Sequence, residues 1–126
     1  MSSSEQITTY EEALRNAIVA MAVESWRFSR IFGRLLAKTD AVERERYENQ
    51  LRWFIKKLEE TLVLAEMNLV NIEGDCYDSG TAATPLNIED FEAQDELIVE
   101  QMLEPIIIGK DGFMKMGTVM LRKVKE

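Results

Sequence analysis

The sequence contains no histidine and a single cysteine, Cys76, among its 126 residues. Without histidine the chain lacks the commonest general base and metal ligand, and it cannot form the usual serine or cysteine triads. One cysteine cannot form an internal disulfide or, without histidine, a zinc site. We therefore expect no catalytic residues, no metal and no cofactor, and a protein that acts by binding rather than as an enzyme. Chemistry that uses carboxylates alone stays compatible with this composition.

Long apolar runs are also missing. The nearest candidate, Ala17 to Val23, has seven residues between Asn16 and Glu24, whereas a helix that spans a bilayer needs about 20. Acidic residues rather than a basic leader precede it, so it does not fit a signal peptide. We expect no membrane partner, and the single cysteine favours a reducing, cytoplasmic location.

Positive charge is scarce in the second half of the chain. The net charge is −8, and from Glu73 to Glu104 the sequence has many acidic residues but no Lys or Arg. Such a surface repels phosphate backbones, so we expect no nucleic acid partner, and a basic protein surface fits better. The same charges could instead serve only to keep a small domain soluble.

The first half has the pattern of an amphipathic helix. Thr8 or Thr9 can cap its start, and Glu11 and Glu12 suit the positive end of the helix dipole. Apolar residues then recur in alternating steps of four and three, which is a heptad pattern. The pattern predicts a helix over residues 9 to 38 after a disordered segment 1 to 8. The seam consists of Leu14, Ile18, Met21, Ser25, Phe28, Phe32 and Leu35.

A second seam follows, out of phase with the first. Asp40 can cap a new helix, with Glu43 three residues later in the manner of a capping box. We expect an antiparallel helical hairpin over residues 9 to 70, with its turn near Thr39; one kinked, continuous helix also fits the pattern, because no glycine or proline marks the turn. The second seam consists of Leu51, Ile55, Leu58, Leu62, Ala65 and Leu69.

Two helices alone bury little apolar surface, so we expect a homodimer in which two hairpins form a four-helix bundle. Alternatively, the C-terminal half folds back over the helices. The expected dimer interface comprises Leu14, Ile18, Met21, Phe28, Phe32, Leu35, Leu51, Ile55, Leu58 and Leu62.

Residues 71 to 126 are predicted to form a small β domain, which makes the chain an α+β protein. Ile106 to Ile108 lead into Gly109-Lys110-Asp111-Gly112, a hairpin-turn signal. Thr118 to Val124 reads as a closing strand with Val119 and Leu121 on one face. We also expect a strand at Leu97 to Leu103, although Ile98 and Met102 would suit a short helix.

The order of these parts resembles the GrpE-type nucleotide exchange factors, dimeric partners of DnaK-type chaperone ATPases. The similarity is greatest at the junction, where Phe54 to Leu62 resembles the last bundle helix of the family. Leu69 to Asp78 then resembles its short strand and G-x-x-[FY]-D turn, here Gly74 with Tyr77-Asp78. Leu97 to Leu103 and Met116 to Val124 are similar to later strands. The long paired helix that usually precedes the bundle has no counterpart.

The resemblance implies that the β domain binds the nucleotide-binding domain of a DnaK-type ATPase and promotes ADP release. The rival is a structural adaptor that dimerises through its helices and binds a component of a larger assembly through its acidic β domain. In both cases we expect the contact around the hairpin and the adjacent acidic strand. The expected partner-binding residues are Glu100, Glu104, Lys110, Phe113, Met114, Lys115 and Met116.

Overall fold

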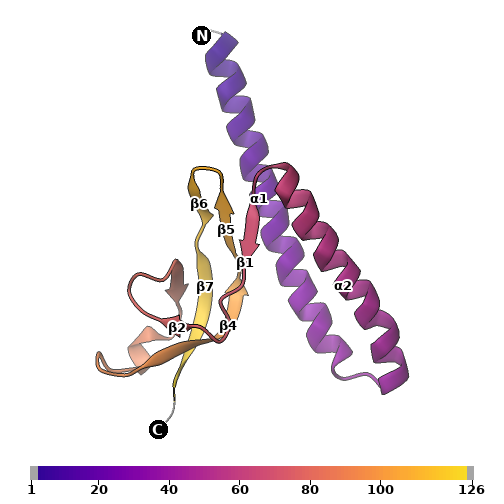
Figure 1. Ribbon diagram of the computed structural model, residues 1–126, viewed down its shortest axis with the longest axis vertical. Helices are drawn as coiled ribbons and strands as arrows, with labels where there is room; N and C mark the ends of the chain where they lie inside the picture. The colour runs from indigo at the N-terminus through magenta and orange to yellow at the C-terminus, as the bar shows by residue number, and fades with distance from the viewer. Residues whose placement is uncertain (1–2, 125–126) are drawn as a thin grey trace. The chain divides into compact units, whose positions relative to one another are not determined.

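The computed structural model describes residues 3–124 and has an α+β fold, as expected. The chain has two compact units, one ending at Glu66 and the other beginning at Met67. Within the described residues, the first unit contains two helices, and the second contains seven short strands and one 3-10 helix (Figure 1). The boundary therefore lies slightly before the expected one at residues 70 and 71.

The first helix, α1 (Ser3–Leu36), begins earlier than expected. The prediction that residues 1 to 8 are disordered is wrong for Ser3 to Thr8, which are helical. Residues 1 and 2 lie outside the described residues. No glycine or proline interrupts this stretch, and Glu5 in the first turn suits the helix dipole. The Thr9 hydroxyl donates to the carbonyl of Glu5 at 2.9 Å inside the helix instead of capping its start.

The second helix, α2 (Ala41–Leu64), runs antiparallel to α1, so the expected hairpin is confirmed and the continuous kinked helix is excluded (Figure 1). Asp40 is the N-cap as predicted, and its carboxylate accepts from the Glu43 amide at 3.0 Å. This bond satisfies one of the amide donors that the first turn of a helix leaves without a partner.

The end of α1 is closed by Arg44, a residue that the sequence pattern does not single out. Its guanidinium donates to the carbonyls of Leu36, Ala37 and Thr39, at 3.2, 3.4 and 2.6 Å. The Thr39 hydroxyl also donates to the Leu36 carbonyl at 2.6 Å. These side chains satisfy carbonyls that a helix end leaves open, which explains a tight turn without glycine or proline.

The predicted second helix over residues 40 to 70 is too long at its C-terminal end. α2 ends at Leu64, and Glu66 has a positive φ of 59° that takes the chain out of the helix. Leu69 continues the helical spacing, but it belongs to a strand and pairs with Ile107. Periodicity could not separate the two cases, because a short apolar segment fits either element.

The first sheet of the second unit is antiparallel, with strand order β1-β5-β6. Its β5–β6 turn is the predicted Gly109-Lys110-Asp111-Gly112 hairpin, with Gly109 paired to Gly112. Gly112 has a φ of 131°, which a side chain would strain. The strands are β1 (Asn68–Val70), β5 (Ile106–Gly109) and β6 (Gly112–Lys115).

The second sheet has the order β2-β4-β7-β3 and contains the two longest strands. β4 and β7 pair antiparallel, whereas β3 runs parallel to β7 on the outer edge. The predicted strand at Leu97 to Leu103 is confirmed as β4, and the closing strand as β7. The strands are β2 (Cys76–Tyr77), β3 (Ala83–Pro85), β4 (Leu97–Glu104) and β7 (Gly117–Lys123), with a 3-10 turn at Ile88–Asp90.

The second unit has its own apolar core. Val119 and Leu121 are buried on one face of β7, as predicted from their spacing, and Val99 and Met102 of β4 pair with Leu121 and Val119, respectively. Packing next to Met102 is tight, because a Cβ on Gly117 would lie 2.9 Å from its methyl carbon. The other buried apolar side chains of this unit are Met67, Ala83, Leu97, Pro105, Ile106 and Ile107.

No helix in residues 3–124 is both long and apolar enough to cross a membrane.

If Arg44 closes the hairpin turn, its removal should destabilise the helices. We expect Arg44→Met to lower the free energy of unfolding by about 1–2 kcal/mol, because three carbonyls lose a charged donor. The control Lys56→Met, at an exposed position of the same helix, should change it by less than about 0.5 kcal/mol. Urea denaturation followed by the helical circular dichroism signal measures both; equal losses would show that Arg44 has no special role.

Candidate interaction surfaces

α1 carries a continuous apolar surface that the chain leaves uncovered. Its centre line is Ile7, Leu14, Met21, Phe28 and Leu35, seven residues apart, and each of these side chains is between 46% and 71% exposed. We call these five residues, with Tyr10, Ile18 and Phe32, the α1 stripe. Single exposed apolar residues are ordinary on a protein surface, but a contiguous row of this length marks an interaction site.

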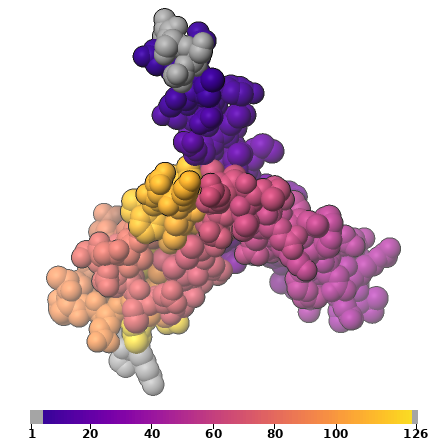
Figure 2. Space-filling model, turned by 45° about the horizontal axis from the view of Figure 1, so that its top comes forward, coloured from indigo at the N-terminus to yellow at the C-terminus, as the bar shows by residue number. Residues whose placement is uncertain are grey.

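The α1 stripe is longer than the sequence analysis expected. Ile7 lies before the expected helix start at Thr9, and Tyr10 lies outside the predicted heptad seam, which begins at Leu14. The signal that could have identified Ile7 is its seven-residue spacing to Leu14, which continues the heptad pattern. Since α1 has 34 residues and α2 has 24, the start of α1 extends beyond the end of α2 by about 15 Å. The indigo end of α1 in Figure 2 is this segment.

The predicted dimer-interface residues fall into two groups. The α1 residues Leu14, Ile18, Met21, Phe28 and Leu35 are exposed, and Phe32 is half-buried. In α2, by contrast, Leu51, Ile55 and Leu58 are half-buried and Leu62 is buried, only 2% exposed. The α2 seam therefore serves mainly to hold the chain together, and α1 supplies most of the surface that a partner could cover.

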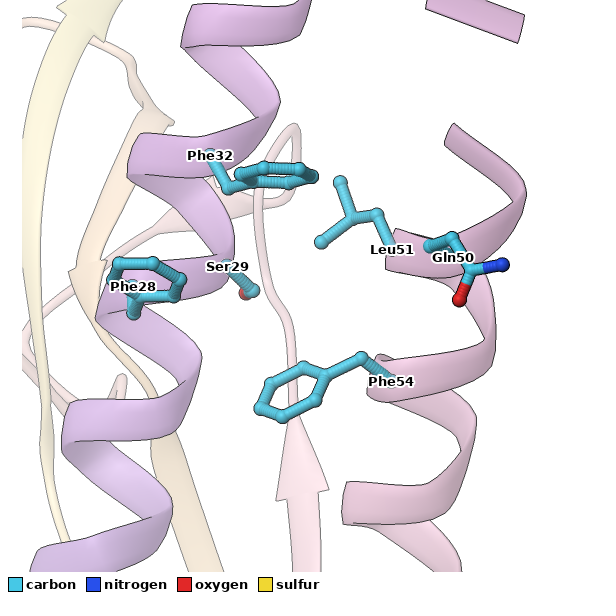
Figure 3. Close-up of a pocket in the computed structure, with 6 residues that line it drawn as sticks. All are labelled: Phe28, Ser29, Phe32, Gln50, Leu51 and Phe54. Atoms are coloured by element: carbon cyan, nitrogen blue, oxygen red, sulfur yellow. The ribbon is translucent and has the colours of Figure 1, made fainter. Parts of the chain in front are cut away.

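A hollow of about 150 Å³ lies between the two helices, at the middle of α2 (Figure 3). Phe32 of α1 and Leu51 and Phe54 of α2 point into it. The rings of Phe28 and Phe32 stack with their centroids 6.4 Å apart. Ser29 offers no free polar group there, since its hydroxyl donates to the Trp26 carbonyl at 2.6 Å. The hollow is therefore suited to an apolar or aromatic side chain.

The β5–β6 hairpin exposes part of the expected partner-binding set. Phe113 and Met116 are exposed, as is Lys110 in the turn. Met114 is half-buried and covers Gly109, where an added Cβ would meet its sulfur and Cγ. Phe113 and Met116 thus each leave an apolar side chain open to a partner, whereas Met114 packs on the hairpin.

Two expected partner-binding charges are instead paired with each other. The Lys115 ammonium lies 3.1 Å from the Glu104 carboxylate, and both side chains are nearly three-quarters buried. The Thr118 hydroxyl donates to the same carboxylate oxygen at 2.7 Å. Glu104, Lys115 and Thr118 therefore form a cross-strand cluster whose groups already satisfy one another.

The period of two in a regular strand predicts that Glu100 and Glu104 share one face of β4, but this strand is irregular. The pairing of β4 with β7 shifts between Val99 and Gln101, and again between Met102 and Glu104. Two such bulges break the period of two on which that expectation rested. Glu100 is exposed at the first bulge. Close by, the carboxylate of Glu73, a residue that the sequence analysis did not single out, accepts from the Met102 amide at 2.8 Å.

The segment from Gly74 to Gly80 folds into a defined turn. Gly74 has a φ of 89°, which favours glycine, and its amide donates to the Val99 carbonyl at 2.8 Å. The Asp78 carboxylate accepts from the Gly80 amide at 2.8 Å, the local capping that its position predicts. In the part of the chain that the structure describes, no group of three or more acidic, His or Cys side chains is placed to hold a metal ion.

Comparisons with protein-family models, with curated proteins and with solved structures find no match to this chain.

The Glu104–Lys115 pair should stabilise the β unit. In a double-mutant cycle of Glu104→Gln and Lys115→Met, we expect a coupling energy of about 0.5–1 kcal/mol that decreases with salt. The Lys57–Glu60 pair, 3.5 Å apart and more than half exposed on each side chain, serves as the control and should couple less. Chemical denaturation of the four variants in each cycle gives both values, and a coupling near zero would contradict the structural role of the pair.

Proposed function

We propose that this protein is a GrpE-like co-chaperone, a homodimer that binds the nucleotide-binding domain of a DnaK-type ATPase and promotes ADP release. The observation that carries the proposal is that each of its two units has a separate exposed apolar surface: the α1 stripe on one, and Phe113 with Met116 on the other. One surface suits self-association, and the other suits a contact with a different macromolecule.

Self-association rests on how little of the helical unit is covered. Among the described residues of α2, only Leu62 is fully buried, and α1 exposes apolar side chains from Ile7 to Leu35. In proteins, a helix gains most of its stability from the packing of its apolar face against other elements. A second hairpin packed on the α1 stripe supplies that packing and yields a four-helix bundle of two copies.

The junction supports the more specific reading. The Gly74 turn, the Asp78 cap and strands β4 and β7 occur at the segments on which the resemblance to the exchange factors rests. The order of helical hairpin, short strand, turn and β unit is also the order that the resemblance requires.

On this proposal, the exposed hairpin side chains Phe113 and Met116 make the central contact, and Lys110 lies at its edge. Aromatic side chains and Met are typical of interface cores, because binding buries a large apolar area of each of these side chains. The acidic side chains from Glu89 to Glu100 are exposed, apart from Asp95, which is half-buried. Their negative charge would speed association with a basic protein surface. Promotion of ADP release requires that ADP weaken the binding of this protein by the same factor.

Nucleotide release from a DnaK-type ATPase of the same organism tests the function. Excess wild-type protein should accelerate the release of a fluorescent ADP analogue. Phe113→Ser should reduce the acceleration about tenfold, because it removes a central aromatic contact. Leu86→Ser, at an equally open apolar position of the same unit, should leave it unchanged. If the wild-type protein has no effect on release but captures a non-ATPase assembly, the adaptor reading replaces the exchange factor.

The dimer is tested by one charge on the α1 stripe. Light scattering should give the wild-type protein twice the 14.5 kDa mass of the chain. Met21→Glu should shift the mass to that of the monomer, because an unpaired carboxylate in an apolar interface costs several kcal/mol. Val42→Glu, at an 80% exposed position outside the α1 stripe, should stay dimeric. A Met21→Glu protein that is still a dimer would place the interface elsewhere.

A further inference from the structure

We infer that Glu104, Lys115 and Thr118 are positioning residues for the partner contact. Their cluster fixes the corner at which the β4–β7 strand pair continues into the β5–β6 hairpin, and so fixes the direction of that hairpin. This role rests on the proposed function, in which Phe113 and Met116 contact the partner, and it adds how the contacting side chains are held in place.

The strands β4 to β7 form two long strands that bend from one sheet into the other. Only Pro105 separates β4 from β5, and only Met116 separates β6 from β7. Because β4 pairs with β7 in one sheet and β5 pairs with β6 in the other, both long strands change sheets at the same level. Figure 1 shows β6 continuing into β7 at this point. A bend through which strands pass from one sheet to another is a corner, and this corner carries the β5–β6 hairpin.

The backbone ladder is interrupted at the corner. On the β4–β7 side its last pair is Glu104 with Thr118. On the hairpin side its first pair is Ile107 with Lys115. None of the described residues between these two pairs forms a ladder pair across the corner, and Pro105 among them has no amide hydrogen to donate. The bend therefore depends on side-chain packing and on hydrogen bonds from side chains.

The cluster joins the two sides of the corner. One carboxylate oxygen of Glu104 accepts from the Lys115 ammonium at 3.1 Å and from the Thr118 hydroxyl at 2.7 Å. Glu104 is the last residue of β4, and Lys115 is the last residue of β6. Both bonds involve a charged group and the two charged side chains are largely buried, which makes such bonds strong. The Glu104–Lys115 bond thus connects one sheet to the other.

The cluster also holds the backbone of Met116. The Lys115 ammonium donates to the Met116 carbonyl at 2.8 Å, while the Met116 side chain is 49% exposed. The next residue, Gly117, is packed against the core, since an added Cβ would lie 2.9 Å from the Met102 methyl carbon and 3.0 Å from Cγ1 of Ile106. Met116 therefore has a fixed backbone on both sides and a side chain that is open to a partner.

A fixed corner matters because Phe113 lies on the hairpin and Met116 lies at the corner itself. A change in the bend would move one of these side chains relative to the other. A surface that is ordered before binding loses less entropy when it binds. If the corner were loose, only the fraction of molecules with the right bend could bind, and the apparent affinity would fall by that fraction. Glu104 and Lys115 thus act through the hairpin instead of touching the partner.

Residual dipolar couplings of the backbone amides test the direction of the hairpin without any partner. In the wild-type protein, the couplings of residues 106–115 should fit the same alignment as those of β4 and β7. Lys115→Met removes both bonds of the ammonium, so the hairpin couplings should shrink and lose this common alignment. Lys115→Arg keeps the charge and the donors and should keep the common alignment.

The matched control is Lys123→Met. It removes the same charge from the same unit and breaks the Lys123–Asp95 ion pair, 3.9 Å apart, at the other end of β7. The common alignment should persist in this variant. In the release of a fluorescent ADP analogue from a DnaK-type ATPase, Lys115→Met should reduce the acceleration at least about threefold, because fewer molecules hold the binding-competent bend. Lys123→Met should leave the acceleration unchanged.

A common alignment that survives in Lys115→Met would overturn the inference, because the cluster would then not set the direction of the hairpin. Equal loss of alignment in Lys123→Met would trace the effect to general destabilisation and would overturn it as well. If Lys115→Met does not fold, Glu104→Met decides in the same way, since it removes the shared acceptor. If the alignment is lost as expected but the wild-type protein does not accelerate ADP release, the role of the cluster stands and only the proposed exchange activity fails.

Discussion

The apolar surface of α1 that its own chain leaves uncovered is the constraint on which the rest of the structure depends. A hairpin of two helices has one shared seam, and here α2 uses Leu51, Ile55, Leu58 and Leu62 to form it. The α1 stripe lies beside that seam and stays open to water. Apolar area exposed on this scale costs free energy in proportion to its extent, so burying it is the main stabilisation still open to the helical unit. Self-association is therefore central to our interpretation of the protein.

The β unit differs, because it has a core of its own. Val99, Met102, Val119 and Leu121 are buried between paired strands, and the Glu104–Lys115–Thr118 cluster satisfies its charges locally. On the proposed function, such a unit would hold its exposed hairpin in one shape and so limit the entropy lost when Phe113 and Met116 bind a partner.

Much of the fold could be predicted from the sequence. The Asp40 cap, the change of helical phase, the Gly109–Gly112 turn and the buried face of β7 are local or periodic signals, and the structure confirms them. The errors arose where local signals compete. Leu69 continues a helical spacing but pairs in a sheet, and Glu100 follows a period of two that β-bulges interrupt. The sequence predicts too late a start for α1, because Thr8 and Thr9 are of a residue type that commonly caps the start of a helix. In the structure both lie inside the helix.

The sequence by itself determined the heptad seam of α1, the acidic segment from Glu73 to Glu104 and the change from helix to strand, because spacing and composition express these directly. Only the tertiary structure decided which apolar residues are already covered and which remain open. It also showed that Lys115 neutralises Glu104 and that Arg44 closes the hairpin turn. These contacts join residues on different elements or across a turn, and their geometry depends on how the chain folds back on itself. No periodic pattern encodes that geometry, so the surfaces available to a partner became visible only in the folded chain.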